Sequence, residues 1–113
     1  MEKLFKIRGI EFYREDFQDN ITEYEDIIEI LKDFQNDLKI EKIKCAEKND
    51  CCNKTSENYI SEIIGVLTQD DEFYTLDEVR SRQSEFENQR LDPFGIQVYK
   101  CIHCNKWIIN ILE

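Results

Sequence analysis

Polar and apolar positions divide the first third of the chain into two patterned segments. Residues 3–13, KLFKIRGIEFY, alternate in part and are rich in β-branched and aromatic side chains. This pattern predicts one strand, kinked at Gly9. Residues 20–38 carry apolar side chains at helical spacing, with two overlapping capping boxes possible at their start. We therefore expect a strand followed by an amphipathic helix.

The middle of the chain is less clearly patterned. Residues 42–58 are polar and rich in turn-forming residues, which predicts a loop. Residues 56–68 have apolar side chains at helical spacing and favour a second helix, but their many isoleucines leave a strand as the alternative. Thr75 and Glu78 form a capping-box pattern that predicts a helix from there to about Arg90.

The C-terminal residues predict a hairpin. Residues 91–95, LDPFG, indicate a turn. Residues 95–101 and 106–113 then read as two strands that meet at a Cys-x-x-Cys step. The predicted fold class is α+β: two to three helices packed on a small antiparallel sheet, with the N-terminal strand beside the C-terminal hairpin. We expect one domain over residues 1–113 because the chain is short.

Composition narrows the class of protein. The chain is 41% hydrophobic and 35% charged, which is typical of a folded, highly charged soluble protein. It contains no apolar stretch of the roughly 18–20 residues that span a bilayer. The N-terminus has charges throughout and no apolar signal core, so we expect a cytoplasmic protein. Five cysteines in that reducing compartment favour metal binding over a disulfide framework.

The Cys-x-x-Cys step at Cys101 and Cys104 is the clearest candidate for chemistry. Zinc takes four ligands in a tetrahedron, and the chain must turn sharply between two cysteines that share one ion. Asn105 follows at a position that needs a residue tolerant of positive φ, and Trp107 then begins a strand. The stretch YKCIHCNKW resembles the knuckle hairpin of zinc ribbons over about 15 residues, with Asn105 where glycine is usual and without a second Cys-x-x-Cys. The resemblance implies a zinc site here.

Two further ligands must come from elsewhere in the chain. Adjacent Cys51 and Cys52 tend to point apart, and the ring of His103 would more naturally face solvent. Our predicted metal ligands, with Cys51 as the reserve, are Cys45, Cys52, Cys101 and Cys104. Four protein ligands make a closed site, so the zinc would be structural.

Three other roles for these cysteines remain open from the sequence. They can be buried, unligated thiols, since free cysteine is a small hydrophobe. They can be a redox pair, although such pairs usually begin a helix and a strand is expected after Cys104. They can also form disulfides in an unrecognised secreted form.

Charge suggests the kind of partner. The formal net charge is −10, and residues 11–37 hold ten acidic residues against two basic ones. Residues 38–54, in contrast, hold five lysines against three acidic residues. These lysines would help to neutralise a four-thiolate zinc centre, or they only keep a loop soluble. The polar face of the predicted helix presents the candidate partner-binding residues, Glu25, Asp26, Glu29, Asp33 and Asp37. These acids can also be an ordinary solvated face.

The small acidic chain loosely resembles the immunity proteins of bacterial toxin systems. That resemblance implies a protein-binding inhibitor, of immunity, antitoxin or anti-defence type, that covers a basic protein such as a toxin or nuclease. A nucleic-acid-associated zinc-ribbon regulatory module is the alternative, but the overall charge opposes nucleic-acid binding. We do not expect an enzyme, because His103 is the only histidine and no phosphate-binding glycine loop is present.

Overall fold

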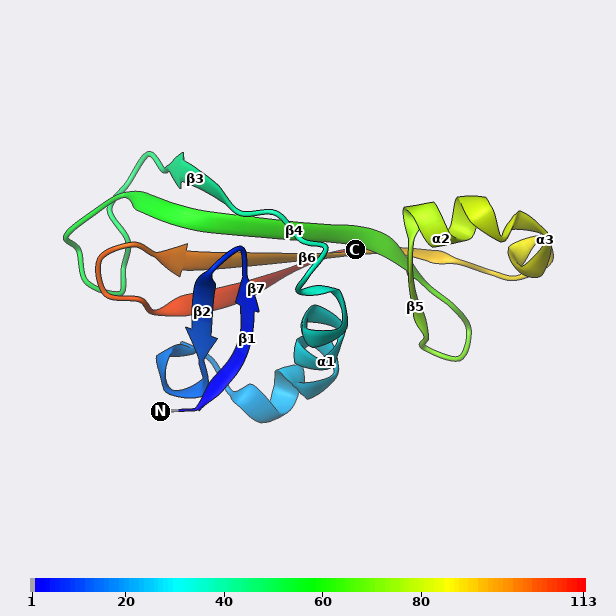
Figure 1. Ribbon diagram of the computed structural model, residues 1–113, viewed down its shortest axis with the longest axis horizontal. Coiled ribbons are helices and arrows are strands. Elements are labelled where there is room, and N and C mark those ends of the chain that lie inside the picture. Colours follow the sequence, from blue (N-terminus) through cyan, green and yellow to red (C-terminus); the bar gives the residue numbers. More distant parts are fainter. Residues whose placement is uncertain (1) are drawn as a thin grey trace.

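A long antiparallel pair of strands forms the centre of the protein. The computed structural model describes residues 2–113, and within them five strands form one sheet (Figure 1). Strands β4 (Glu57–Leu67) and β6 (Asp92–Cys101) pair along almost their whole length. The sheet order is β3 (Glu41–Lys44), β4, β6 and β7 (Trp107–Leu112), while β5 (Phe73–Thr75) pairs with the far end of β4. The α+β class is confirmed.

The N-terminal segment is a hairpin rather than the single kinked strand we predicted. Strands β1 (Lys3–Ile7) and β2 (Ile10–Tyr13) pair antiparallel in a sheet of their own. The two residues between them have positive φ, 50° at Arg8 and 85° at Gly9. Positive φ at both central residues is the geometry of a type I′ turn, whose twist matches that of the flanking strands. The chain therefore reverses where we expected only a kink.

The helices lie close to their predicted positions but are shorter. A 3-10 turn, η2 (Ile21–Tyr24), leads into α1 (Glu25–Phe34), and a second 3-10 turn, η1 (Arg14–Asp16), precedes them. Both reciprocal hydrogen bonds of the Thr75–Glu78 capping box are present. The helix that this box begins is broken after one short segment, giving α2 (Leu76–Ser81) and α3 (Gln83–Phe86).

Three predictions for the sheet region were wrong. Residues 56–68 form β4 and not a helix, the predicted loop over residues 42–58 includes most of β3, and the predicted turn at residues 91–95 lies largely within β6. The apolar residues of β4 fit a strand because they occupy both faces: Ile63 is buried in the core, while the neighbouring Ile64 is exposed. A strand with apolar residues on both faces has no simple alternation to recognise.

Trp107, the first residue of β7, connects the N-terminal hairpin to the large sheet. Its side chain is 1% exposed, and its ring contacts those of Phe5 and Phe12 edge-on at centroid distances of 5.4 Å. The ring of Phe17 lies 4.5 Å away, and the indole N–H donates to the carbonyl of Tyr13 at 2.8 Å. The N-terminal hairpin thus packs on the sheet instead of pairing with the C-terminal strands.

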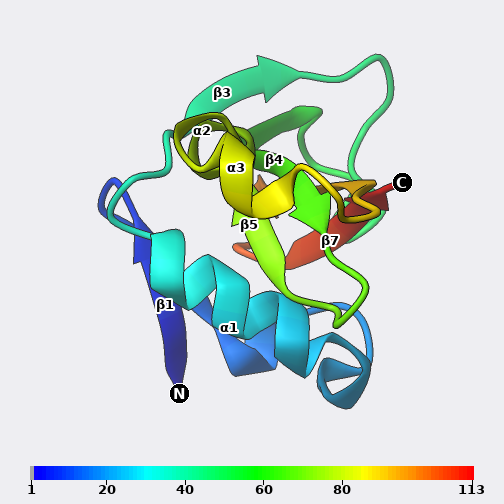
Figure 2. The same cartoon turned by 90° about the vertical axis from the view of Figure 1, so that its right-hand side faces the viewer.

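The molecule is elongated. Its extents are 49 × 28 × 23 Å and its radius of gyration is 15.4 Å, compared with about 13 Å for a compact chain of this length. Figure 2 shows α1 and β1 together on one side of the sheet, with α2 and α3 at the near end. The β4–β6 strand pair extends beyond the main core, and the connection between the two strands contains β5, α2 and α3 (Figure 1).

Replacing Trp107 by alanine should lower the free energy of unfolding by about 3–5 kcal/mol, because a fully buried aromatic side chain and its hydrogen bond are lost. Ile108→Ala is the matched control, since the adjacent Ile108 side chain is 43% exposed; it should cost less than about 1 kcal/mol. Urea unfolding of both variants measures the difference. Equal effects would contradict the central role of the indole.

Candidate metal centre

The sheet order brings two cysteine-bearing loops to the same end of the molecule. The β3–β4 connection carries Cys51 and Cys52. The β6–β7 connection carries Cys104, three residues after Cys101, the last residue of β6. Because β4 and β6 pair with Asn58 opposite Cys101, the two connections leave the sheet side by side (Figure 1). Cysteines about 50 positions apart in sequence thereby meet.

The β6–β7 connection has the hydrogen bonds of a tight turn. The N–H of Cys101 donates to the carbonyl of Lys106 at 2.9 Å, and the N–H of Asn105 donates to the carbonyl of Cys101 at 3.2 Å. Asn105 has φ of 69°, the left-handed conformation expected from its position after the second cysteine. The turn therefore directs both Cys101 and Cys104 toward the β3–β4 connection.

A second turn, at residues 49–53, presents Cys51 and Cys52. The N–H of Asn53 donates to the carbonyl of Asn49 at 2.7 Å, and Asn53 has φ of 54°. Asn49 is itself fixed to the base of the loop, because its side-chain amide donates to the carbonyl of Glu57 at 3.2 Å. In this closed turn two adjacent cysteines do not diverge as they would in an extended strand.

The four sulfur atoms have the spacing of a metal site. The Sγ atoms of Cys51, Cys52, Cys101 and Cys104 all lie within 4.8 Å of one another. The Cys52–Cys101 sulfur distance is 3.7 Å, and the Cys51–Cys104 distance is 3.0 Å. A tetrahedron with Zn–S bonds of about 2.3 Å has sulfur–sulfur edges of about 3.8 Å. These four thiols can therefore hold a metal ion such as zinc with small adjustments.

Hydrogen bonds favour the thiolate at one of the four positions. Burial of Cys101 opposes ionisation, but the N–H groups of Cys104 and His103 and the side chain of Asn49 outweigh it and lower the pKa of Cys101 to about 6. Burial raises the pKa of Cys51, and hydrogen bonding to Cys104 acts in the same direction. Donors to a cysteine sulfur also stabilise a metal-bound thiolate. The turn is thus suited to hold a metal as well as to shape the chain.

The structure brings together three of the four predicted ligands. Cys52, Cys101 and Cys104 belong to the cluster, but Cys51 occupies the fourth position that we assigned to Cys45. Cys45 lies at the base of the loop, where its Sγ accepts a hydrogen bond from the side chain of Asn58 at 3.5 Å. The reserve residue is therefore the better-placed ligand, because the turn at residues 49–53 lets adjacent cysteines converge.

A cavity of about 430 Å³ opens beside the cluster. Its lining includes Cys45, Cys51 and Cys101, and also two basic and two acidic residues, Lys48, Lys106, Glu47 and Asp50. His103 is exposed and lies outside the cysteine cluster.

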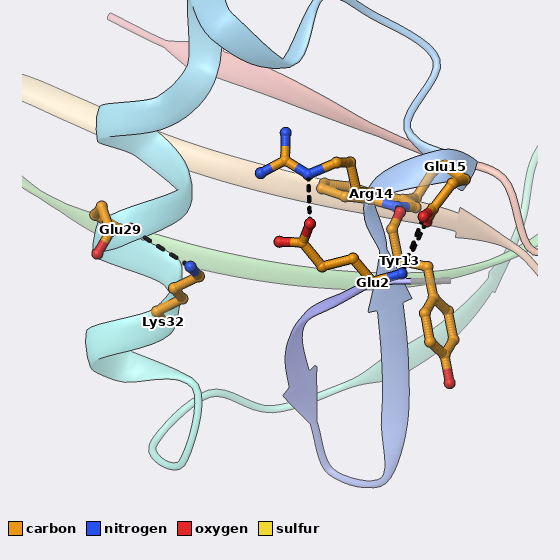
Figure 3. Close-up of polar contacts among 7 residues, drawn as sticks. Glu2, Tyr13, Arg14, Glu15, Glu29 and Lys32 are labelled. Atoms are coloured by element: carbon orange, nitrogen blue, oxygen red, sulfur yellow. Dashed lines mark hydrogen bonds and ion pairs between the residues drawn. The ribbon is translucent and has the colours of Figure 1, made fainter.

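The predicted acidic residues lie on a different element. Glu25, Asp26, Glu29 and Asp33 are exposed on α1, and Asp37 is exposed in the turn that follows. Figure 3 shows the ion pair that Glu29 forms with Lys32 at 3.4 Å. Among residues 2–113, no other member of this acidic set forms an ion pair.

Single-cysteine variants should distinguish the two possible ligand sets. We expect Cys51→Ser to weaken zinc binding by at least about 100-fold, because it leaves an incomplete set of thiolates, whereas Cys45→Ser should change it less than about threefold. Competition with a chromophoric chelator measures both affinities, and the thiolate-to-cobalt absorption of the Co²⁺ form reports the number of sulfur ligands. A larger loss with Cys45→Ser would restore the ligand set predicted from the sequence.

Across the stretch that the structure describes, no helix has both the length and the apolar character to cross a membrane. No family model, no curated protein and no solved structure matches the chain.

Proposed function

We propose that this protein is a small acidic inhibitor, of immunity, antitoxin or anti-defence type, that binds a basic protein such as a toxin or nuclease. A structural zinc ion bound by Cys51, Cys52, Cys101 and Cys104 would stabilise the scaffold. The observation that carries the proposal is the exposed and largely unpaired row of carboxylates on α1.

One face of α1 is buried and apolar, and the other is exposed and acidic. Ile28 and Leu31 are buried against the core, so the helix is fixed in orientation. Its opposite face presents acids at positions 25, 26, 29 and 33, and within residues 2–113 only Glu29 of these forms an ion pair, with Lys32. Carboxylates that form no ion pair within the protein retain their negative electrostatic potential, which attracts a basic surface and accelerates association. A rigid helix with such a face is suited to cover a cationic site.

Zinc would stabilise the scaffold because the cysteine loop has little apolar content of its own. Residues 45–56 contain mostly polar side chains, most of them exposed or half-buried. Such a loop gains little from hydrophobic burial and needs another source of order. Four thiolates on one ion would fix the loop to the β6–β7 turn, and the closed coordination leaves no open position for catalysis. The reducing cytoplasm that we expect for this protein would keep the thiols available.

Charge reversal on α1 tests the proposal. The protein is used as bait in cells of its source, a bound protein is identified by mass spectrometry, and its affinity is then measured with both components purified. We expect a basic partner, and Glu29→Lys with Asp33→Lys should weaken binding at least about tenfold, mainly through slower association that depends on salt.

Glu85→Lys with Glu87→Lys is the matched control. It makes the same change in net charge. Glu85, like Glu29, forms an exposed ion pair with a residue three positions away, here Arg82. The control should retain the affinity within about twofold, and neither double variant should change the melting temperature by more than a few degrees. An acidic partner, or equal losses in the two variants, would refute the role of α1.

A further inference from the structure

The outer edge of β4 contains a gap in its strand pairing. One edge of β4 pairs with β6 along its length. The other edge pairs with β3 as far as Ile60 and with β5 from Gly65 onward. Figure 1 shows β3 and β5 near opposite ends of β4. Within the part of the chain that the structure describes, residues 61–64 have no strand beside them on this edge.

Register shows which backbone groups point into the gap. On one side of the gap the N–H of Cys45 donates to the carbonyl of Ser56 at 2.8 Å, and on the other the N–H of Thr68 donates to the carbonyl of Glu72 at 2.9 Å. Both bonds join directly opposite residues, and backbone groups alternate in direction along an antiparallel strand. Even-numbered residues of β4 therefore direct their N–H and C=O groups to this edge. In the gap these residues are Glu62 and Ile64.

The gap is also a groove. Two cavities of about 370 and 480 Å³ adjoin there, and they share Asp37, Leu38 and Glu62 in their linings. The first reaches Ile60 and Ser61, and the second continues past Ile63 and Ile64 to α2. The groove thus runs along the unpaired edge of β4 from the start of β3 to α2.

A buried hydroxyl without a partner lines this groove. Ser61 is 3% exposed, and its Oγ forms no hydrogen bond within residues 2–113. Buried polar atoms are nearly always hydrogen-bonded, because an unsatisfied one is unfavourable. Ser61 lines the cavity beside Leu38 and Lys39, where a polar group of a bound segment could reach it. This orphaned atom points to a missing partner independently of the strand gap.

Side chains around the groove indicate the chemistry of that partner. Ile64 and Leu76 are 39% and 41% exposed, and both line the end near α2. Acidic residues outnumber basic ones in the combined lining: Asp37, Glu41, Glu62 and Asp77 against Lys39 and Arg80. An occupant with an apolar anchor and positive charges would match both features.

We propose that an extended segment of a basic protein adds to β4 in this gap as a short antiparallel strand. The strand would run in the same direction as β3 and β5, and about four residues would span the gap at roughly 3.4 Å each. Its backbone would bond to the free N–H and C=O groups of Glu62 and Ile64. Read from its N-terminus, the segment would have an apolar residue opposite Ile64 and a basic residue opposite Glu62, two positions later. A hydroxyl-bearing residue opposite Ser61 would follow.

This inference rests on the proposed function in that the partner is basic, and it adds the kind of segment that is bound. The probe is a fluorescein-labelled, amidated hexapeptide of sequence Lys-Thr-Val-Thr-Lys-Thr. Its last four residues would fill the gap with valine opposite Ile64, and its first two would leave the edge at Gly65, where the pairing with β5 begins. The control peptide carries an N-methyl group on that valine, which removes one backbone donor and leaves side chains and charge unchanged. Fluorescence anisotropy with the zinc-loaded protein measures both affinities.

We expect the N-methyl peptide and the Ile64→Arg variant each to weaken binding at least tenfold. Ile108→Arg is the matched variant, because Ile108 is similarly exposed, at 43%, and lies on β7, outside the groove; it should change the affinity less than threefold. Amide hydrogen exchange gives a second readout. The N–H groups of Glu62 and Ile64 should exchange rapidly in the free protein and at least tenfold more slowly with the peptide bound.

Three results would overturn the inference. The first is no binding of the peptide, and the second is equal binding of both peptides, which would indicate attraction by charge alone. The third is protection of the Glu62 and Ile64 N–H groups that rises with protein concentration in the absence of peptide, which would indicate pairing between two copies of this chain. If the peptide fails but a basic partner still depends on Glu29 and Asp33, the proposed function stands and only the groove is wrong. If the peptide binds and no basic partner exists, the proposed function fails and the groove remains a strand-binding site.

Discussion

The indole of Trp107 is the contact on which the arrangement of the other elements depends. It packs against aromatic rings of β1, β2 and the segment at Phe17, and its N–H is satisfied by the carbonyl of Tyr13. Only two residues separate it from Cys104, the last cysteine of the cysteine cluster. The start of β7 is therefore fixed from two directions, by the core on one side and by the cysteine turn on the other.

Local patterns predicted the elements whose structure is decided locally. The position of α1, the capping box at Thr75 and the two C-terminal strands were predicted from spacing alone, because caps and one-sided apolar faces leave a signature in sequence. Strand β4 was assigned to a helix because its apolar residues also fit helical spacing. What decides its structure is β6, which lies more than 20 residues further along the chain and pairs with it over ten positions. Tertiary pairing of this kind overrides local preference.

The cysteine cluster was predicted in part from local sequence, and the rest of it depends on tertiary structure. The Cys-x-x-Cys step and the left-handed Asn105 could be predicted, since both belong to one short turn. The choice between Cys45 and Cys51 could not, because it depends on how the β3–β4 connection closes on itself. The amide of Asn49 bonds to the carbonyl of Glu57 and fixes the turn that carries Cys51. The general expectation that adjacent cysteines diverge does not hold in such a turn.

The two ends of the gap in β4 are set by different constraints, which is why its length is well defined. At one end, the gap begins where β3 starts, at Glu41 opposite Ile60. The cysteine loop joins the other end of β3 to β4, so a metal bound there would help to hold β3 in register. At the other end, β5 approaches β4 so closely that a Cβ on Gly65 would lie 2.2 Å from the carbonyl oxygen of Tyr74. Only glycine permits this approach, and β5 cannot slide into the gap without losing it. A strand that adds to residues 61–64 would therefore meet an edge already ordered on both sides. Its binding would carry a smaller entropic cost than binding to a flexible edge, and the metal centre would contribute to affinity without touching the partner.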